Sequence, residues 1–110
     1  MSRVAAATDV FHAIADPTRR VILDRLKMGT APVHELCTGL TISRPAVSKH
    51  LRVLKDAHLV RERRDGRERV YELDPTPLRD IASWIEGYRA FWALNLQSLK
   101  AFVEAEVRKG

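Results

Sequence analysis

Residues 43–57 constrain the fold of this chain more than any other segment. Val47, Leu51 and Leu54 recur at helical spacing, so they predict a helix with one apolar stripe that packs into a core. Ser43 is a favourable N-cap residue immediately before this pattern. We therefore expect a helix anchored by its inner stripe, with an opposite face that carries cations and a hydroxyl group: Arg44, Ser48, Arg52 and Lys55, with Lys49 beside them.

Beyond this helix the pattern changes to two strand-like runs. Residues 59–64 and 67–73 flank the dipeptide Asp65-Gly66. An Asp-Gly pair between such runs predicts a β-hairpin, because a type I′ turn needs positive φ at both central residues. The tip of the hairpin is rich in arginine, with Arg63, Arg64 and Arg67.

Shorter helices are predicted before the basic helix. Residues 5–15 form the first, and Asp16-Pro17 begins the second, because aspartate caps free N–H groups and proline is tolerated at the first helical position. Residues 33–39 predict a third helix, followed by a four-residue break. The segment 33–57 is therefore expected to be a helix-turn-helix.

Taken in order, these elements predict a winged helix-turn-helix. We expect a mainly α fold with a small β-hairpin and one domain over residues 1–110, with the wing at residues 59–73. An α-helix fits the major groove of B-DNA, and arginines on a wing can reach phosphates or a narrow minor groove. The candidate DNA-binding residues are Arg44, Ser48 and Arg52 on the helix and Arg63, Arg64 and Arg67 on the wing.

Charge is concentrated in the same region. The net charge is +5, and residues 43–72 carry nine basic and five acidic side chains, so they hold most of the excess. A basic segment on a nearly neutral body favours a polyanionic partner such as double-stranded DNA. Charge alone leaves a solvated surface as an equal alternative.

The segment 77–108 predicts a last helix that is too long and too apolar for a small domain to cover. It runs from about Leu78 to Val107, or about 45 Å. We expect it to pair with the first helix and with a second copy of the chain, rather than only wrapping its own domain. Such a homodimer would place two recognition helices about 34 Å apart, on an inverted-repeat operator. The candidate dimerisation residues are Val10, Phe11, Ile14, Ile81, Ile85, Tyr88, Trp92 and Leu99.

Three segments resemble the ArsR family of winged-helix regulators. They are residues 15–23 (ADPTRRVIL), residues 43–55 (SRPAVSKHLRVLK) and residues 63–73 (RRDGRERVYEL). The resemblance covers roughly residues 8–100 and implies a homodimeric transcriptional regulator, usually a repressor that a signal releases from its operator. It places Ser43, Arg44, Ser48, Lys49 and His50 on the DNA-reading face.

The sensing end of the chain is less informative. Founding members of the family bind an ion through a Cys-x-Cys pair in the third helix, whereas here Cys37 is followed by Thr38 and Gly39. One thiolate cannot supply the ligands of a soft ion, so we predict no metal and no cofactor. The aromatic-rich last helix resembles the non-metal branch of the family. A metal- or thiol-responsive repressor that uses Cys37 remains the alternative, and an unknown small-molecule effector is compatible with either.

Other function classes find little support. The chain has no glycine-rich phosphate loop, no Gly-x-Ser-x-Gly motif and no clustered Cys, His and carboxylate set, so we predict that it is not an enzyme. No apolar run approaches the ~20 residues of a membrane span, and we expect a cytoplasmic protein that is associated with the nucleoid when bound to its operator. A winged-helix protein-interaction module is a further alternative, although such a module need not keep arginine, serine and lysine together on the outer helix face.

Overall fold

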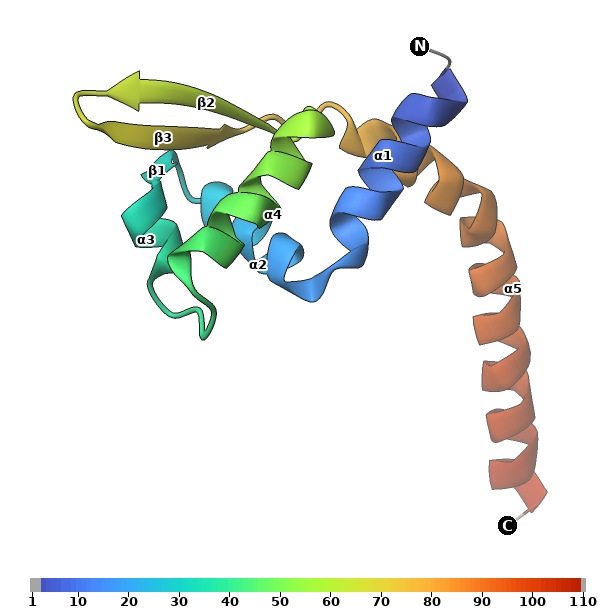
Figure 1. Cartoon of the computed structure of the whole chain (residues 1–110). Helices are drawn as coiled ribbons and strands as arrows, with labels where there is room; N and C mark the ends of the chain where they lie inside the picture. The colour runs from blue at the N-terminus through green and yellow to red at the C-terminus, as the bar shows by residue number, and fades with distance from the viewer. Residues whose placement is uncertain (1–2, 110) are drawn as a thin grey trace.

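The computed structural model describes residues 3–109, and its elements follow the predicted order (Figure 1). The helices are α1 (Arg3–Ala15), α2 (Pro17–Leu26), α3 (Val33–Cys37), α4 (Arg44–Asp56) and α5 (Leu78–Lys109). The strands are β1 (Ala31–Pro32), β2 (Val60–Asp65) and β3 (Glu68–Leu73). The predicted mainly α architecture, with a hairpin between the basic helix and the last helix, is confirmed.

The core forms where α4 packs against α1, α2 and α3. Val47, Leu51 and Leu54 of the predicted stripe have no exposed surface, and Ile22 and Leu59 are buried to nearly the same extent. Burial of a large aliphatic side chain contributes about 1.5–3 kcal/mol, so this stripe fixes the orientation of α4. The opposite face of α4 is thereby held toward solvent.

The predicted cap of α2 is present. The side chain of Asp16 accepts a hydrogen bond of 3.0 Å from the backbone N–H of Arg19, and Pro17 occupies the first helical position. α3 is shorter than predicted and ends at Cys37, because the chain turns at Gly39 with a φ of +85°.

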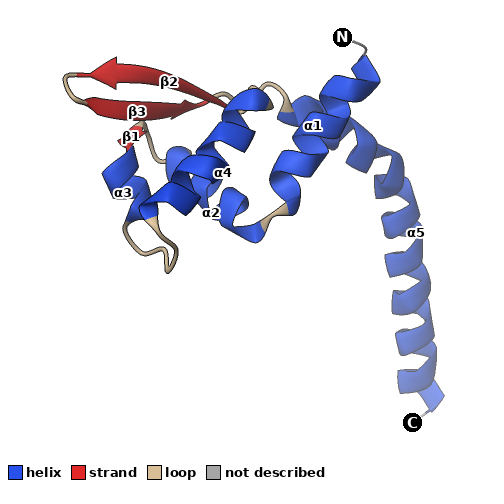
Figure 2. Ribbon diagram, viewed as in Figure 1, coloured by secondary structure: helices blue, strands red, loops and turns tan. Residues whose placement is uncertain are grey.

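The hairpin belongs to a three-stranded antiparallel sheet with the order β1-β3-β2 (Figure 2). Asp65 pairs with Glu68, so the two turn residues are Gly66 and Arg67. Of these two, only Gly66 has positive φ, at +65°. The predicted type I′ turn centred on Asp65-Gly66 is therefore wrong, and the dihedral pattern is that of a type II′ turn with glycine first.

β1 was not predicted, because two residues before a helix show no strand periodicity. Ala31 pairs with Tyr71, and Pro32 pairs with Val70. Ala31 has no exposed surface, so this short pairing joins the helix-turn-helix to the wing within the core. Proline is tolerated there because β1 is an edge strand.

α5 leaves the body of the protein after its first two turns (Figure 1). Ile81 is buried in the core, and Leu78 and Ile85 pack against its edge. Beyond Ile85 the helix projects alone, which accounts for principal extents of 69 × 36 × 21 Å. An isolated projecting helix has no core of its own to stabilise it.

Candidate DNA interface

The outer face of α4 is open to solvent. Ser43, Arg44, Ser48, Lys49 and Arg52 are all exposed. The Ser43 hydroxyl accepts a hydrogen bond of 3.3 Å from the backbone N–H of Ala46, so this serine also caps the helix. None of the ion pairs found in residues 3–109 involves Arg44, Lys49 or Arg52. These three cations are therefore available to an anionic partner.

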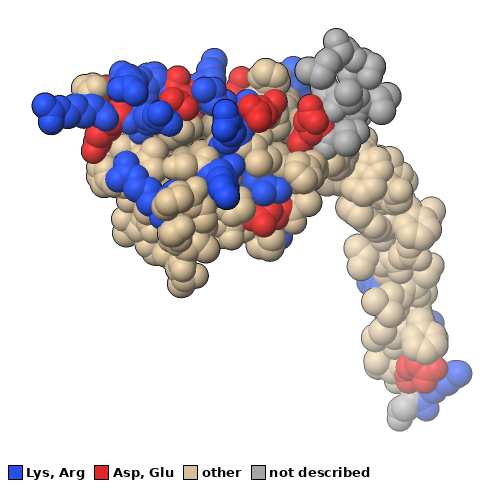
Figure 3. All heavy atoms as spheres, viewed as in Figure 1, with Lys and Arg blue, Asp and Glu red and all other residues tan. Residues whose placement is uncertain are grey.

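The hairpin continues the positively charged surface beyond α4. Arg63, Arg64 and Arg67 are exposed at or near its tip. On the face of the molecule shown in Figure 3, lysine and arginine side chains gather over the hairpin and α4. The projecting part of α5 carries few charges in that view until its C-terminal end. The helix and the hairpin thus share a surface on which basic side chains predominate, with acidic side chains among them.

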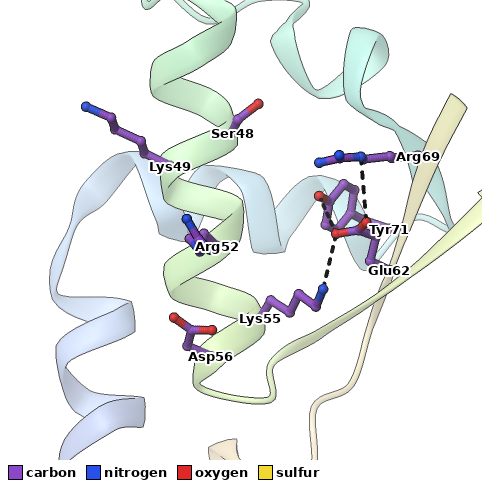
Figure 4. A pocket seen from close by; sticks show the side chains of 8 residues that line it. All are labelled: Ser48, Lys49, Arg52, Lys55, Asp56, Glu62, Arg69 and Tyr71. Atoms are coloured by element: carbon purple, nitrogen blue, oxygen red, sulfur yellow. Dashed lines mark hydrogen bonds and ion pairs between the residues drawn. The ribbon is translucent and has the colours of Figure 1, made fainter.

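A cleft of about 580 Å³ separates the outer face of α4 from the hairpin (Figure 4). Glu62 on β2 lines the hairpin side of this cleft and accepts a hydrogen bond of 3.0 Å from the hydroxyl of Tyr71. Lys55 Nζ lies 3.4 Å from one oxygen of this carboxylate, and Arg69 Nε lies 3.7 Å from the other. The residues that line the cleft are Ser48, Lys49, Arg52, Lys55, Asp56, Glu62, Arg69 and Tyr71.

The ionisation of this cluster follows from its contacts. Burial alone would raise the pKa of Glu62, but the Tyr71 hydrogen bond and the nearby Lys55 and Arg69 lower it overall. Burial and the hydrogen bond to Glu62 raise the pKa of Tyr71 above its ordinary value. At neutral pH the cluster therefore contains a carboxylate, two cations and a neutral phenol.

His50 lies on the inner edge of the recognition helix. Its Nδ1 is 3.3 Å from a guanidinium nitrogen of Arg19 and 4.0 Å from the carboxylate of Asp16. Arg19 is buried and donates to the backbone carbonyls of Ala13 (2.6 Å) and His12 (2.9 Å). His50 therefore connects α4 to the junction of α1 and α2, in addition to the DNA contact that the resemblance implies.

The predicted dimerisation residues fall into two groups. Val10 and Ile81 are buried in the core of the chain itself, and Phe11, Ile14 and Ile85 pack against that core. Tyr88, Trp92 and Leu99 are exposed on α5. An aromatic series runs along this helix from α1, with ring centroids 5.7 Å apart for Phe11 and Trp84, 5.2 Å for Trp84 and Tyr88, and 6.3 Å for Tyr88 and Trp92.

Cys37 is a free and partly buried thiol at the end of α3. Within the described part of the chain, no three His, Cys, Asp or Glu side chains are grouped so that they could hold a metal ion. None of the helices described between residues 3 and 109 has the length and apolar character of a membrane span.

Arg69 and the acceptor Glu62 were not predicted as parts of the site. The predicted turn placed Glu62 opposite Arg69, whereas the observed register places it opposite Tyr71. The role of Arg19 was missed as well, because residues 16–19 were interpreted only as a helix start. The signal that could have indicated this cluster is a glutamate on one strand of the hairpin, Glu62, with an arginine on the neighbouring strand, Arg69.

Comparison with known proteins agrees with this geometry. Residues 16–62 match the model for bacterial regulatory proteins of the arsR family, a range that spans α2 to the first residues of β2. The HTH-type transcriptional regulator Rv2034 of Mycobacterium tuberculosis is 42% identical over 106 residues, which cover 96% of each chain. The chain belongs to the ArsR family.

Other members of the family are similar over most of the chain. The transcriptional repressor SdpR of Bacillus subtilis is 42% identical over 80 residues, which cover 73% of this chain and 89% of SdpR. The crystal structure of the ArsR family transcriptional regulator RHA00566 superposes with a TM-score of 0.74 at 30% identity, over 84% of this chain and 95% of that one.

Family membership establishes the class of function. The chain is a DNA-binding transcriptional regulator with a winged helix-turn-helix, in a family that is not enzymatic. Regulators of the ArsR family bind DNA and commonly act as dimers. The predicted family, fold and class of function are therefore confirmed.

Proposed function

We propose that this ArsR-family chain is a homodimeric repressor, and an autorepressor, that binds an inverted-repeat operator. α4 lies in the major groove, where Arg44 and Arg52 contact base edges and Ser48 contacts a base or a phosphate. Ser43, Lys49 and His50 lie along the adjacent backbone. The wing residues Arg63, Arg64 and Arg67 reach phosphates or the minor groove.

One observation carries this proposal. The apolar stripe of α4 is fully buried, while Arg44, Lys49 and Arg52 project to solvent without an ion-pair partner among the described side chains. A helix that is held rigidly with free cations on its outer face is suited to bind a groove whose walls are phosphates. A protein-interaction module would not require this set of side chains.

The homodimer is supported by the apolar surface of α5. Ten of the twelve large hydrophobic side chains that are exposed among the described residues lie on this helix. Exposed apolar surface of this extent is typical of protein–protein interfaces. The interface that we propose centres on Tyr88, Trp92 and Leu99, and the segment 77–108 serves as the dimerisation helix of a single domain.

The setting of this activity follows from its target. A repressor acts where the chromosome is, so we propose a cytoplasmic protein that is associated with the nucleoid when bound to its operator. The family resemblance also supports release from the operator by a small-molecule effector.

The recognition face is tested by Arg44→Ala and Arg52→Ala in quantitative binding to a duplex from the gene's own upstream region. Loss of a base contact should weaken binding by about 1–3 kcal/mol without changing dimerisation. Arg79→Ala is a matched control, because Arg79 is an exposed arginine on the first turn of α5. Unchanged binding by both α4 variants would contradict the proposed orientation of this helix.

A further inference from the structure

The Glu62 carboxylate occupies an unusual place for a surface that binds an anion. It lies in the cleft between the recognition helix α4 and the wing, within reach of Lys55 and Arg69 (Figure 4). A carboxylate near the DNA backbone repels phosphates, so its presence there needs a physical explanation. The contacts of Glu62 provide that explanation.

Glu62 joins three elements. Tyr71, its cross-strand partner on β3, is only 5% exposed, so its hydroxyl is held by the core and fixes the carboxylate at 3.0 Å. Lys55 approaches from α4, and Arg69 approaches from β3. The side chain of Glu62 is itself only 21% exposed, whereas those of Lys55 and Arg69 are more than half exposed.

The electrostatic consequence concerns Lys55 and Arg69. One fixed carboxylate between two cations leaves a net charge of +1 where the cations alone would present +2. Each phosphate that a cation neutralises adds about 0.9 to the slope of log affinity against log salt, and this contribution does not depend on DNA sequence. A cation that is already paired to a partly buried carboxylate contributes less to this salt slope.

We propose that Glu62 is a specificity-determining residue, which holds Lys55 and Arg69 back from the phosphate backbone. By weakening sequence-independent binding, it leaves discrimination to the unpaired side chains of α4, namely Arg44, Ser48 and Arg52. This inference rests on the proposed function, because it assumes that the cleft faces DNA.

Glu62→Gln tests the inference directly. Glutamine keeps the shape and can still accept the Tyr71 hydrogen bond, but it releases both cations. Binding to a mixed-sequence duplex should become tighter at low salt, and the salt slope should steepen by about 1. For each released cation, affinity should fall by an additional factor of about three between 50 and 200 mM salt.

Glu72→Gln is the matched control. It removes the same charge from the same hairpin, but Glu72 is exposed and pairs with Arg61 at 3.7 Å. The Arg61–Glu72 pair is adjacent to the Glu62–Tyr71 pair in the register, so it lies on the other face of the hairpin. This variant should keep the salt slope of the parent. A steepening as large as that of Glu62→Gln would overturn the inference, because net charge alone would then explain it.

Lys55→Met provides a second test through a double-mutant cycle. In the parent it should change the salt slope little, because the ion pair with Glu62 already holds Lys55 back from the phosphate backbone. In the Glu62→Gln background the same substitution should reduce the slope by about 1. Equal effects in the two backgrounds would overturn the inference, and thermal unfolding of each variant shows whether the fold is retained.

The outcomes separate this inference from the proposed function. If the parent binds the duplex and Glu62→Gln has the same or a shallower slope, the inference fails and the proposed function stands. If the parent does not bind duplex DNA at all, both fail. A steeper slope with tighter mixed-sequence binding, confined to Glu62→Gln, supports both.

Discussion

α4 and α5 are both amphipathic helices with one face turned away from the core, yet they expose opposite chemistry. α4 buries Val47, Leu51 and Leu54 completely and presents Arg44, Lys49 and Arg52 to solvent. α5 buries Ile81 and then exposes aromatic and aliphatic side chains along the rest of its length. The exposed face of each helix favours a different kind of partner, because free cations suit DNA and apolar surface suits another protein.

The two helices also contribute to stability in different ways. The apolar residues of α4 stabilise the chain by themselves, since the core surrounds them on every side. The apolar residues of α5 beyond Ile85 lie outside the core and remain largely exposed, and the aromatic contacts of Tyr88 and Trp92 are with neighbours on the same helix. Burial of this surface therefore requires a partner. The stabilisation from the exposed residues of α5 should therefore depend on protein concentration, whereas that from the core residues of α4 should not.

The largest effect on stability is expected for a buried leucine of α4, in contrast to an exposed leucine of α5. Leu51→Ala should lower the free energy of unfolding by about 2–5 kcal/mol at every protein concentration, because it leaves a cavity in the core. Leu99→Ala, at a leucine that is 59% exposed, should instead shift the monomer–dimer equilibrium toward monomer. Urea unfolding at several concentrations, with sedimentation equilibrium, measures both. A concentration-independent loss in Leu99→Ala would contradict the assignment of α5 to dimerisation.

Within the DNA-binding region, the wing is expected to act differently from α4. Arg67→Ala at the exposed tip should weaken binding to every duplex by a similar factor and reduce the salt slope by about 1, because the wing contacts the backbone. Arg52→Ala should instead reduce discrimination between operator and mixed sequence. Salt titrations on the two duplexes distinguish these outcomes, and a sequence-dependent effect of Arg67→Ala would show that the wing reads bases.

A smaller effect is expected where α4 ends. His58 adopts a positive φ of +61° just after the helix, and the backbone N–H of Leu59 closes the end by donating to the carbonyl of Leu54 at 2.9 Å. Glycine has no Cβ penalty in this conformation, so His58→Gly should stabilise the protein by roughly 1 kcal/mol. Thermal unfolding measures the change, and His58→Ala should not show the gain.

The smallest effect concerns acidic pH. The backbone N–H of Arg19 holds the pKa of Asp16 below its ordinary value, that of Thr76 does the same for Asp74, and the Tyr71 hydrogen bond with the nearby Lys55 and Arg69 lowers the pKa of Glu62. The folded state therefore binds fewer protons than the unfolded state at acidic pH. The stability that these carboxylates contribute should be fully present above their ordinary pKa and should be lost as the pH falls through the lowered pKa of the folded state. Glu62→Gln should flatten part of this decrease in urea midpoints, and an unchanged profile would contradict the lowered pKa of Glu62.

Most of the fold could be predicted from local patterns. The cap at Asp16, the stripe on α4 and the length of α5 depend on residues close together in sequence, and each is present in the structure. β1 could not be predicted, because its two residues form a strand only through pairing with Val70 and Tyr71, far along the chain. Long-range pairing leaves no periodic trace in so short a segment.

The hairpin shows how a local error affects a site. Moving the turn by one residue, from Asp65-Gly66 to Gly66-Arg67, changes every cross-strand partner while keeping the same faces of the strands. The free cations of α4 were therefore predicted, since they depend only on helical spacing. The Glu62–Tyr71 pair was not, since it depends on register.

A footprint of the protein on the gene's own upstream region tests whether a dimer presents two copies of α4 to DNA. If a dimer formed through α5 presents two copies of α4, protection should cover two inverted half-sites with centres about one helical turn apart. Arg52→Ala should lose protection over both half-sites, and Arg79→Ala should retain it. A single protected half-site, or protection that Arg44→Ala and Arg52→Ala leave intact, would contradict the account.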